Sequence, residues 1–243
     1  MELTILHLYP DCMSLYGEYA NVAVLRRHLE AAGVAVTVRQ AGLDDVPDFS
    51  GVGFVYMGAG TERGQKWALA ALGPHAPALK ELLEQGAPAL FTGNAMELLG
   101  QSVADRAGKV WPCLGLAEFT TQETDRRVPG DVIAHTPLWD EPVVGFMNKC
   151  SYTAGVTSPL FDRLTLGEGN EGMGGGEGYV SGNLFATHLT GPVLVKNPAF
   201  TRLMVARIFA HNGWLLPDSL PALPYEQEAY QMTLRELSAR TGG

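Results

Sequence analysis

The sequence predicts an α/β fold, a three-layer domain with a mostly parallel central sheet and a small antiparallel extension. Over residues 1–101, apolar β-prone runs alternate with segments of helical periodicity, and parallel strands need such crossover connections. After Val110, strand-like segments follow one another without helices between them, which favours an antiparallel arrangement. The length of 243 residues allows one large domain or two small ones.

The first half of the chain contains four predicted strands and two helical regions. Apolar or alternating runs predict strands over residues 3–9, 34–39, 52–57 and 88–91. A helix is expected over residues 16–32, where Val22, Leu25 and Leu29 recur at helical spacing and Gly33 supplies a stop. A second helical region covers residues 66–85, and we expect Pro74 to break or kink it.

The second half predicts short strands, a glycine-rich loop and two helices. Strand-like segments cover residues 119–127, 132–135, 142–147 and 180–190, and helices cover residues 198–211 and 226–240. Residues 167–178 hold seven glycines and three glutamates without a lysine or arginine, which repels an anion and favours a mobile loop near a site. Prolines 217, 221 and 224 mark an irregular connector. The expected division is a main domain, residues 1–212, and a Pro-rich segment with a terminal helix, residues 213–243.

Composition excludes several classes of function. The formal net charge is −9, which argues against nucleic acid as a partner because phosphate binding needs a basic face. Cys12, Cys113 and Cys150 are widely spaced and form no CxxC pair, so we expect reduced thiols in a cytoplasm and no metal centre. No signal peptide and no membrane-spanning segment are expected. No cofactor is predicted.

The stretch most typical of a catalytic site is residues 88–100. A buried strand, the turn Thr92-Gly93-Asn94 and a helical pattern with Met96, Leu98 and Leu99 follow one another. This order is that of a nucleophile elbow, in which a reactive side chain stands on a tight turn at a helix start. Neither Gly93 nor Asn94 is a good nucleophile, because glycine has no side chain and an amide reacts very poorly. The shape of a catalytic site is thus predicted without its usual reactive atom.

Two further segments are candidates, each with a plainer alternative. Gly58, Ala59 and Gly60 follow a predicted strand, and their backbone N–H groups suit either an oxyanion-stabilising loop or a simple tight turn. His188 and Thr190 are two residues apart on a predicted strand and therefore share one face. His188 is a candidate general base or a hydrogen-bonded structural residue. The spacing of the glycines fits neither a P-loop nor a dinucleotide-binding fingerprint.

Several motifs in combination resemble a known family. They are LYPD at residues 8–11, LYGEYAN at 15–21, the loop from Gly58 with Glu62 and Gln65, LLG at 98–100, GFMN at 145–148, GEGN at 167–170 and GPVLVKNP at 191–198. Together they resemble the class I glutamine amidotransferases of the cobyric acid synthase type over residues 3 to about 210. The most similar group is the amidotransferase subunit of lipid II isoglutaminyl synthase, which works with a Mur-ligase-like partner. The resemblance implies the same three-layer fold.

The resemblance assigns roles to positions at which this chain has changed. The family nucleophile is a Cys where this chain has Gly93, and the family base is a His where it has Thr190. His188 stands where the family tends to have Tyr, and Tyr152 stands where a glutamine-binding Arg is expected. Met147, Lys149 and Glu97 likewise replace an expected Glu, His and Gln. The candidate substrate-binding residues are Gly58, Ala59, Gly60, Gln65, Asn94 and Tyr152.

We therefore expect a glutamine amidotransferase-like pseudoenzyme of peptidoglycan biosynthesis, a cytoplasmic subunit in a heterodimer with a Mur-ligase-like protein. Gly93 relieves the strain that an elbow imposes on other residues, about 1–3 kcal/mol, and we expect it to face Thr190 across a cleft. Two alternatives remain open. One is an active amidotransferase with a relocated nucleophile such as Cys150. The other is a binding module that uses Asn94, Tyr152 and His188 to recognise glutamine or another small ligand.

Overall fold

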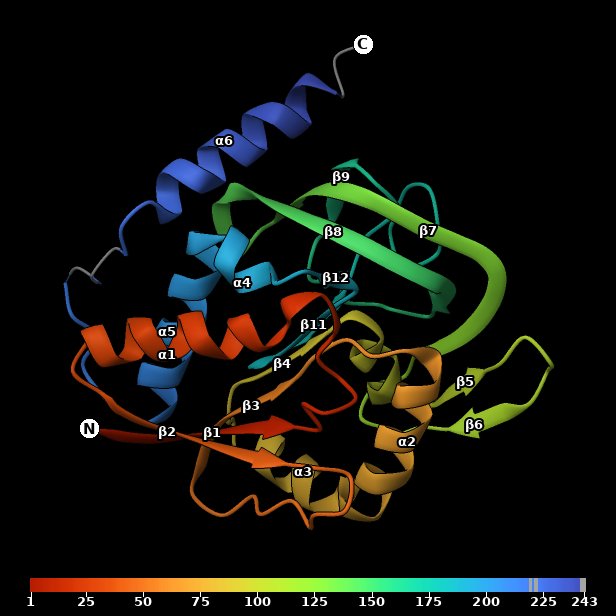
Figure 1. Cartoon of the computed structure of the whole chain (residues 1–243), viewed down its shortest axis with the longest axis horizontal. Coiled ribbons are helices and arrows are strands. Elements are labelled where there is room, and N and C mark those ends of the chain that lie inside the picture. Colours follow the sequence, from red (N-terminus) through yellow and green to blue (C-terminus); the bar gives the residue numbers. More distant parts are fainter. Residues whose placement is uncertain (219, 221–222, 241–243) are drawn as a thin grey trace.

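In the computed structural model (Figure 1), the chain forms two six-stranded sheets that meet at an angle, with helices on both faces of the central one. The structure describes residues 1–218, 220 and 223–240. The α/β prediction with a mostly parallel central sheet is confirmed. No helix in the described part of the chain is long and apolar enough to cross a membrane.

The central sheet contains five parallel strands and one antiparallel edge strand, in the order β10-β11-β4-β3-β1-β2. Their bounds are β1 (Glu2–Leu8), β2 (Ala35–Ala41), β3 (Val52–Met57), β4 (Ala89–Thr92), β10 (Tyr179–Ser181) and β11 (Leu184–Thr187). All six residues of β3 are buried. This is the burial expected of a parallel strand that is covered on both faces.

Two hydrophobic clusters cover the two faces of the central sheet, which gives the predicted three layers. The helices are α1 (Tyr19–Ala31), α2 (Glu62–Leu72), α3 (Ala76–Glu84), α4 (Val193–Lys196), α5 (Pro198–His211) and α6 (Glu226–Ala239). Ile5 and Phe54 pack with α1 and α5 on one face, whereas Leu8 and Met57 pack with α2 and α3 on the other. A short 3₁₀ turn, η2 (Gly73–His75), separates α2 from α3, so the break predicted at Pro74 is confirmed.

The second sheet is larger than the small extension that the sequence predicts. Its strands are β5 (Ser102–Ala104), β6 (Val110–Pro112), β7 (Thr120–Thr136), β8 (Trp139–Ala154), β9 (Arg163–Leu166) and β12 (Leu189–Thr190). The predicted strands at 119–127 and 132–135 are one strand, β7, that runs through Pro129. Pro129 is opposite Asn148 on β8, and the other neighbours of β7 pair only with residues 120–122 and 133–135. The proline therefore sits where the strand is locally an edge, which is the position that a sheet tolerates.

The single strand predicted over residues 180–190 is wrong, because the chain turns and then changes sheets there. Gly182 has φ +57°, and the two-residue Gly182-Asn183 turn joins β10 to β11 as a hairpin. Ser181 and Leu184, on either side of the turn, pair with each other. After β11 the chain leaves the central sheet, and β12 pairs with β8 in the second sheet. His188 is the residue between these two strands. It therefore lies at the junction of the two sheets.

The terminal helix α6 lies on the outer face of the second sheet (Figure 1). Tyr230 and Leu237 are buried against Ile133 and Val144. Tyr230 also donates its hydroxyl to the carbonyl of Pro142 at 2.8 Å. The helix predicted over residues 226–240 is thus confirmed as Glu226–Ala239.

One buried amide joins the second sheet to the helices. Asn197 accepts the N–H of Val144 at 2.8 Å and donates to the carbonyls of Val144 and Val193, each at 2.8 Å. Asn197→Ala should lower the free energy of unfolding by about 2–3 kcal/mol, because three buried backbone groups lose their partner. Urea denaturation measures this change. The matched control, Asn183→Ala, removes one half-buried hydrogen bond to Gly86 and should lose about 1 kcal/mol; equal losses would contradict the prediction.

Candidate active-site pocket

A pocket lies where the carboxyl ends of the parallel strands meet the second sheet. Its cavity volume is about 280 Å³, at the small end of ligand pockets. The carboxyl edge of a parallel sheet is the usual position for a ligand. The residues that the sequence singled out and that line the pocket are Ala59, Gly60, Glu62, Gln65, Gly93, Asn94, Glu97, Lys149, Cys150, His188 and Thr190. Gly58 and Tyr152 are not part of the lining.

The elbow at Gly93 has no room for a side chain. Gly93 has φ +59° and joins β4 to the 3₁₀ helix η3 (Gly93–Leu99), where the sequence predicted an α-helix. A Cβ built on Gly93 would lie 2.4 Å from the Cβ of Ala59 and 3.1 Å from its Cα. A residue other than glycine would thus meet both an unfavourable backbone conformation and a steric clash. The pocket wall at the family nucleophile position is backbone alone.

The Gly58–Gly60 loop is packed against Cys12 and Met13 and is hydrogen-bonded to Asn94. A Cβ on Gly60 would lie 2.4 Å from the Sδ of Met13 and 2.5 Å from the carbonyl oxygen of Cys12, so close approach requires glycine here. The N–H of Gly60 donates to the Oδ1 of Asn94 at 2.9 Å. Gln65 in turn donates to the backbone carbonyl of Asn94 at 2.7 Å. One of the loop N–H groups that could stabilise an oxyanion is therefore already bonded to Asn94.

Thr190 donates its hydroxyl to a buried carboxylate. The Oγ1 of Thr190 lies 2.9 Å from Oε1 of Glu18, and the N–H of Gly191 lies 2.7 Å from the same oxygen. The other oxygen, Oε2, accepts hydrogen bonds from the hydroxyls of Tyr56, at 2.8 Å, and Thr92. Burial and the Glu18 charge raise the pKa of Tyr56 well above its ordinary value, so Tyr56 remains a neutral donor. Thr190 thus fixes the pocket wall and offers no base.

His188 bridges two buried glutamates. Its backbone N–H and its Nδ1 lie 2.7 and 3.1 Å from Oε1 of Glu177, and its Nε2 lies 3.7 Å from Oε1 of Glu97. Thr153 Oγ1 is a further neighbour, 3.4 Å from Nε2. Both ring nitrogens therefore face structural partners, although the imidazole also lines the pocket. This arrangement fits both predicted roles, a hydrogen-bonded structural histidine and a general base whose ring is oriented by Glu177.

Glu97 carries a negative charge at the floor of the pocket. Burial acts to raise its pKa, but hydrogen bonding and charge from His188, with hydrogen bonds from Ser151 and Gln65, outweigh burial and lower it. Ser151 Oγ donates to Oε1 at 2.5 Å, and Gln65 Nε2 donates to Oε2 at 2.7 Å. The carboxylate that replaces the expected Gln thus accepts hydrogen bonds from two neighbours and lies 3.7 Å from His188.

Tyr152, predicted as a ligand-binding residue, points away from the pocket lining. Its hydroxyl accepts a hydrogen bond from Arg126 at 2.8 Å, and Arg126 also pairs with Glu168. The next residue, Arg127, lines the pocket instead. Arg126 and Arg127 lie where the register between β7 and β8 shifts, between Glu123 and Val128, and there they send one side chain to Glu168 and one to the pocket. The pair of adjacent arginines was the available signal for Arg127.

Cys150 lines the pocket and is the cysteine that the relocated-nucleophile alternative invoked. Its Sγ donates to Oε1 of Glu62 at 2.9 Å. Burial first, and then the hydrogen bond and charge of Glu62, raise the pKa of the Cys150 thiol to about 12 against the opposing charge of Arg127. Near neutral pH the thiol is therefore protonated, and the thiol is much less nucleophilic than the thiolate. The structure holds Cys150 in its unreactive form.

The glycine-rich loop, residues 167–178, is anchored by buried polar groups. Lys149 Nζ donates to the carbonyls of Gly169 and Asn170 at 2.6 and 3.1 Å. The side chain of Asn170 makes two 2.9 Å hydrogen bonds with the backbone of Gly178. Within the described residues, no group of three or more His, Cys, Asp or Glu side chains could hold a metal ion.

Comparisons with known proteins agree with this geometry. The family model of the CobB/CobQ-like glutamine amidotransferase domain matches residues 4–198. The subunit GatD of lipid II isoglutaminyl synthase (glutamine-hydrolyzing) from Staphylococcus aureus is 28% identical over 87% of this chain and 86% of that protein. Its Streptococcus pneumoniae namesake is 29% identical over 81% of this chain and 76% of that protein.

Solved structures share the fold at low sequence identity. A glutamine amidotransferase from Thermotoga maritima superposes with a TM-score of 0.53 and 9% identity, covering 98% of this chain and 97% of that chain. Another structure described as a glutamine amidotransferase gives a TM-score of 0.51 and 13% identity over 84% of this chain and 98% of that chain.

The contact between Gly93 and Ala59 can be measured by a double-mutant cycle. Gly93→Ala should lower the free energy of unfolding by about 2–4 kcal/mol, because it combines positive φ with a clash. Adding Ala59→Gly should recover about 1 kcal/mol or more of that loss, since it removes the clashing methyl. Gly182→Ala is the matched control: Gly182 has φ +57° and no atom within 4 Å of a built Cβ. If the changes in free energy of unfolding at residues 59 and 93 were simply additive, the proposed clash between the two positions would be wrong.

Glu62 should control the reactivity of Cys150. Glu62→Gln removes the negative charge that opposes the thiolate and leaves Arg127, which favours it, so the pKa of Cys150 should fall. The alkylation rate by iodoacetamide at pH 8 should rise about tenfold for each unit of decrease. Mass spectrometry of the modified peptide measures this rate. Cys113, whose pKa burial and Glu97 raise to about 12, should not respond; an unchanged rate at Cys150 would refute the role of Glu62.

Proposed function

The chain belongs to the CobB/CobQ-like glutamine amidotransferase family, and from this premise we propose that it is a non-hydrolysing counterpart of the amidotransferase subunit of lipid II isoglutaminyl synthase. It acts in peptidoglycan amidation, in the cytoplasm, as one half of a heterodimer with a Mur-ligase-like protein. That partner then takes its nitrogen from free ammonia. The relatives whose names carry this activity are 28–29% identical to this chain.

The observation that carries the proposal is that three catalytic requirements of glutamine hydrolysis are each replaced by an internal contact. The nucleophile position is Gly93, and Ala59 fills the space of its missing side chain. The oxyanion donor of the loop, the N–H of Gly60, is bonded to Asn94. The base position is Thr190, whose hydroxyl donates to Glu18.

Hydrolysis of glutamine by this family's chemistry needs all three functions in one place. A thiolate attacks the side-chain amide carbon, backbone donors stabilise the oxyanion, and a base accepts the thiol proton and returns it to the departing ammonia. Thr190 cannot act as the base near neutral pH, because an aliphatic hydroxyl is too weakly basic to take a proton there; it donates its own proton to Glu18. Without a thiolate, no covalent intermediate forms at Gly93.

The relocated-nucleophile alternative rests on Cys150, which lines the pocket. Its neighbour Glu62 is a poor base, because hydrogen bonds from Cys150 and Arg127 outweigh burial and lower the pKa of Glu62 to about 2. Glu62 in turn raises the pKa of the Cys150 thiol, so proton transfer from the thiol to Glu62 is disfavoured. A glutamine-analogue electrophile that labels Cys150 at the rate of an active amidotransferase would nevertheless establish this alternative.

The binding-module alternative rests on the polar lining of the pocket. Arg127, Lys149, Glu62 and Glu97 all line a cavity of about 280 Å³, although Arg127 pairs directly with Glu62 and Lys149 donates to backbone carbonyls. A lining that carries both signs of charge suits a zwitterion such as an amino acid. A thermal-shift screen with amino acids separates this function from a purely structural subunit. A ligand that raises the midpoint of unfolding without being hydrolysed would be consistent with both binding and the loss of catalysis.

The proposal predicts that the purified protein does not release glutamate from glutamine above the uncatalysed rate. With the Mur-ligase-like protein of the same organism, the complex should amidate its substrate with ammonium and not with glutamine. A coupled glutamate assay and mass spectrometry of the product measure both. Co-purification tests the heterodimer separately. Glutamate release at enzymatic rates, with or without the partner, would overturn the proposal.

Restoring the family's Cys at residue 93 and His at residue 190 should require extra space next to Ala59 for the cysteine side chain. Gly93→Cys with Thr190→His should remain inactive or nearly so, because a residue at position 93 still meets Ala59. Adding Ala59→Gly should yield weak glutaminase activity, about tenfold or more above the two-residue variant. The added Ala59→Gly change alone is the matched control and should be silent. If the third change gives no gain while all variants fold, the pocket differs from an active one at further positions.

A further inference from the structure

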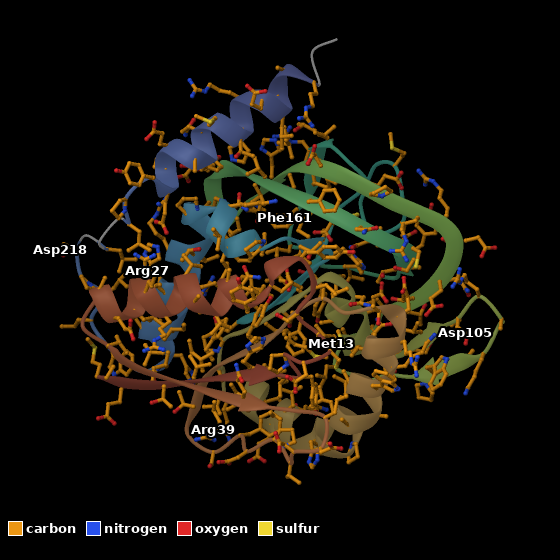
Figure 2. All side chains as sticks on the ribbon, in the orientation of Figure 1. Met13, Arg27, Arg39, Asp105, Phe161 and Asp218 are labelled. Atoms are coloured by element: carbon orange, nitrogen blue, oxygen red, sulfur yellow. The ribbon has the colours of Figure 1, made fainter. Side chains whose placement is uncertain are left out.

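Two tryptophans and three cations form an exposed surface beside the pocket, here called the tryptophan patch. It consists of Arg63, Lys66, Trp67, Lys109 and Trp111. Arg63 lies 4.5 Å from the centre of the Trp67 ring on α2, and Lys109 lies 3.7 Å from that of Trp111 on β6. Lys66 joins the two halves, 5.5 Å from the Trp111 ring. In Figure 1, α2 and the β5–β6 hairpin stand side by side, and Figure 2 labels Asp105 on that hairpin.

The patch is an apolar and aromatic surface that water reaches. Trp67 is 48% exposed, and Val110, next to Trp111, is 58% exposed. Tryptophan and arginine are the residues most enriched among energetic hot spots of protein interfaces. Large exposed aromatic side chains of a soluble protein commonly mark an interaction site. The inner side of α2 carries Glu62 and Gln65 into the pocket, so the patch borders the pocket.

The charges of the patch are only partly neutralised by the chain itself. Lys66 pairs with Glu123 at 2.9 Å, and Asp105 accepts hydrogen bonds from the Trp111 indole and the backbone of Lys109. Arg63 and Lys109, in contrast, have no carboxylate within salt-bridge distance among the described residues. Two unneutralised cations thus stand on the rings of two tryptophans, on a chain whose net charge is −9. An acidic partner complements this patch.

We propose that the tryptophan patch is a docking surface for an acidic segment of a protein partner. Carboxylates of the segment pair with Arg63 and Lys109, while its apolar side chains pack on Trp67, Trp111 and Val110. An anionic membrane surface is a different occupant, and the test below distinguishes it from an acidic segment. This inference does not depend on whether the pocket hydrolyses glutamine, since the patch lies outside the pocket.

The test uses the full chain and a fluorescein-labelled peptide of glutamate and leucine residues, with binding followed by fluorescence anisotropy. We expect saturable binding that weakens with salt. Arg63→Ala with Lys109→Ala should weaken it about tenfold, and Trp67→Ala should weaken it several-fold. The matched control is Arg27→Ala with Arg235→Ala, which removes the same charge on α1 and α6, away from the patch; Figure 2 labels Arg27 on the opposite side from Asp105. The control should change the affinity less than about twofold.

Several results would overturn the proposal. If the control double variant lost as much affinity for the peptide as the Arg63 and Lys109 double variant, binding would depend on net charge alone. If the Arg63 and Lys109 double variant kept its affinity, the tryptophan patch would not be the binding site. Preferential binding to phosphatidylglycerol vesicles would assign the surface to a membrane. Self-association in sedimentation that the Arg63 and Lys109 pair abolishes would assign it to a second copy of the chain. All the substituted residues are exposed, so circular dichroism should show unchanged folding in every variant.

Discussion

The carboxylate of Glu18 is the group on which the geometry of the pocket depends. It is fully buried and accepts hydrogen bonds from β3 through Tyr56, from β4 through Thr92, and from the start of the 191–198 motif through Gly191. An unpaired buried charge would be very unfavourable, and these charge-assisted bonds offset its desolvation. The positions of the elbow and of the sheet junction are thereby tied to one side chain.

A second network, centred on Glu97, holds the other side of the pocket. It joins α2, η3 and β8 through Gln65 and Ser151, whereas Glu177 fixes His188 at the junction of the two sheets. The polar groups of the pocket are therefore satisfied by one another, as buried polar groups must be. This mutual satisfaction explains how the pocket keeps its shape although Gly93 and Thr190 offer neither a thiol nor an imidazole.

Local signals predicted much of the fold. Buried apolar runs, the helix beginning at Pro198 and the break at Pro74 follow from residues within a few positions of one another, and the structure agrees with them. Pairings between distant residues could not be predicted in this way. The neighbour of Cys150 is Glu62, 88 residues away, and the path of β7 through Pro129 depends on which neighbouring strands end short of it. The elbow turn was visible in the sequence, but the Ala59 methyl that closes it was not.

The packing of Ala59 against Gly93 couples the residues that the two positions can hold. A mutation that placed a cysteine at residue 93 would bring its Cβ against the Ala59 methyl group, so its first effect would be a lower free energy of unfolding. A mutation that cleared the methyl group first would bring no benefit until the second one followed. A thiol at residue 93 therefore depends on a second change at residue 59.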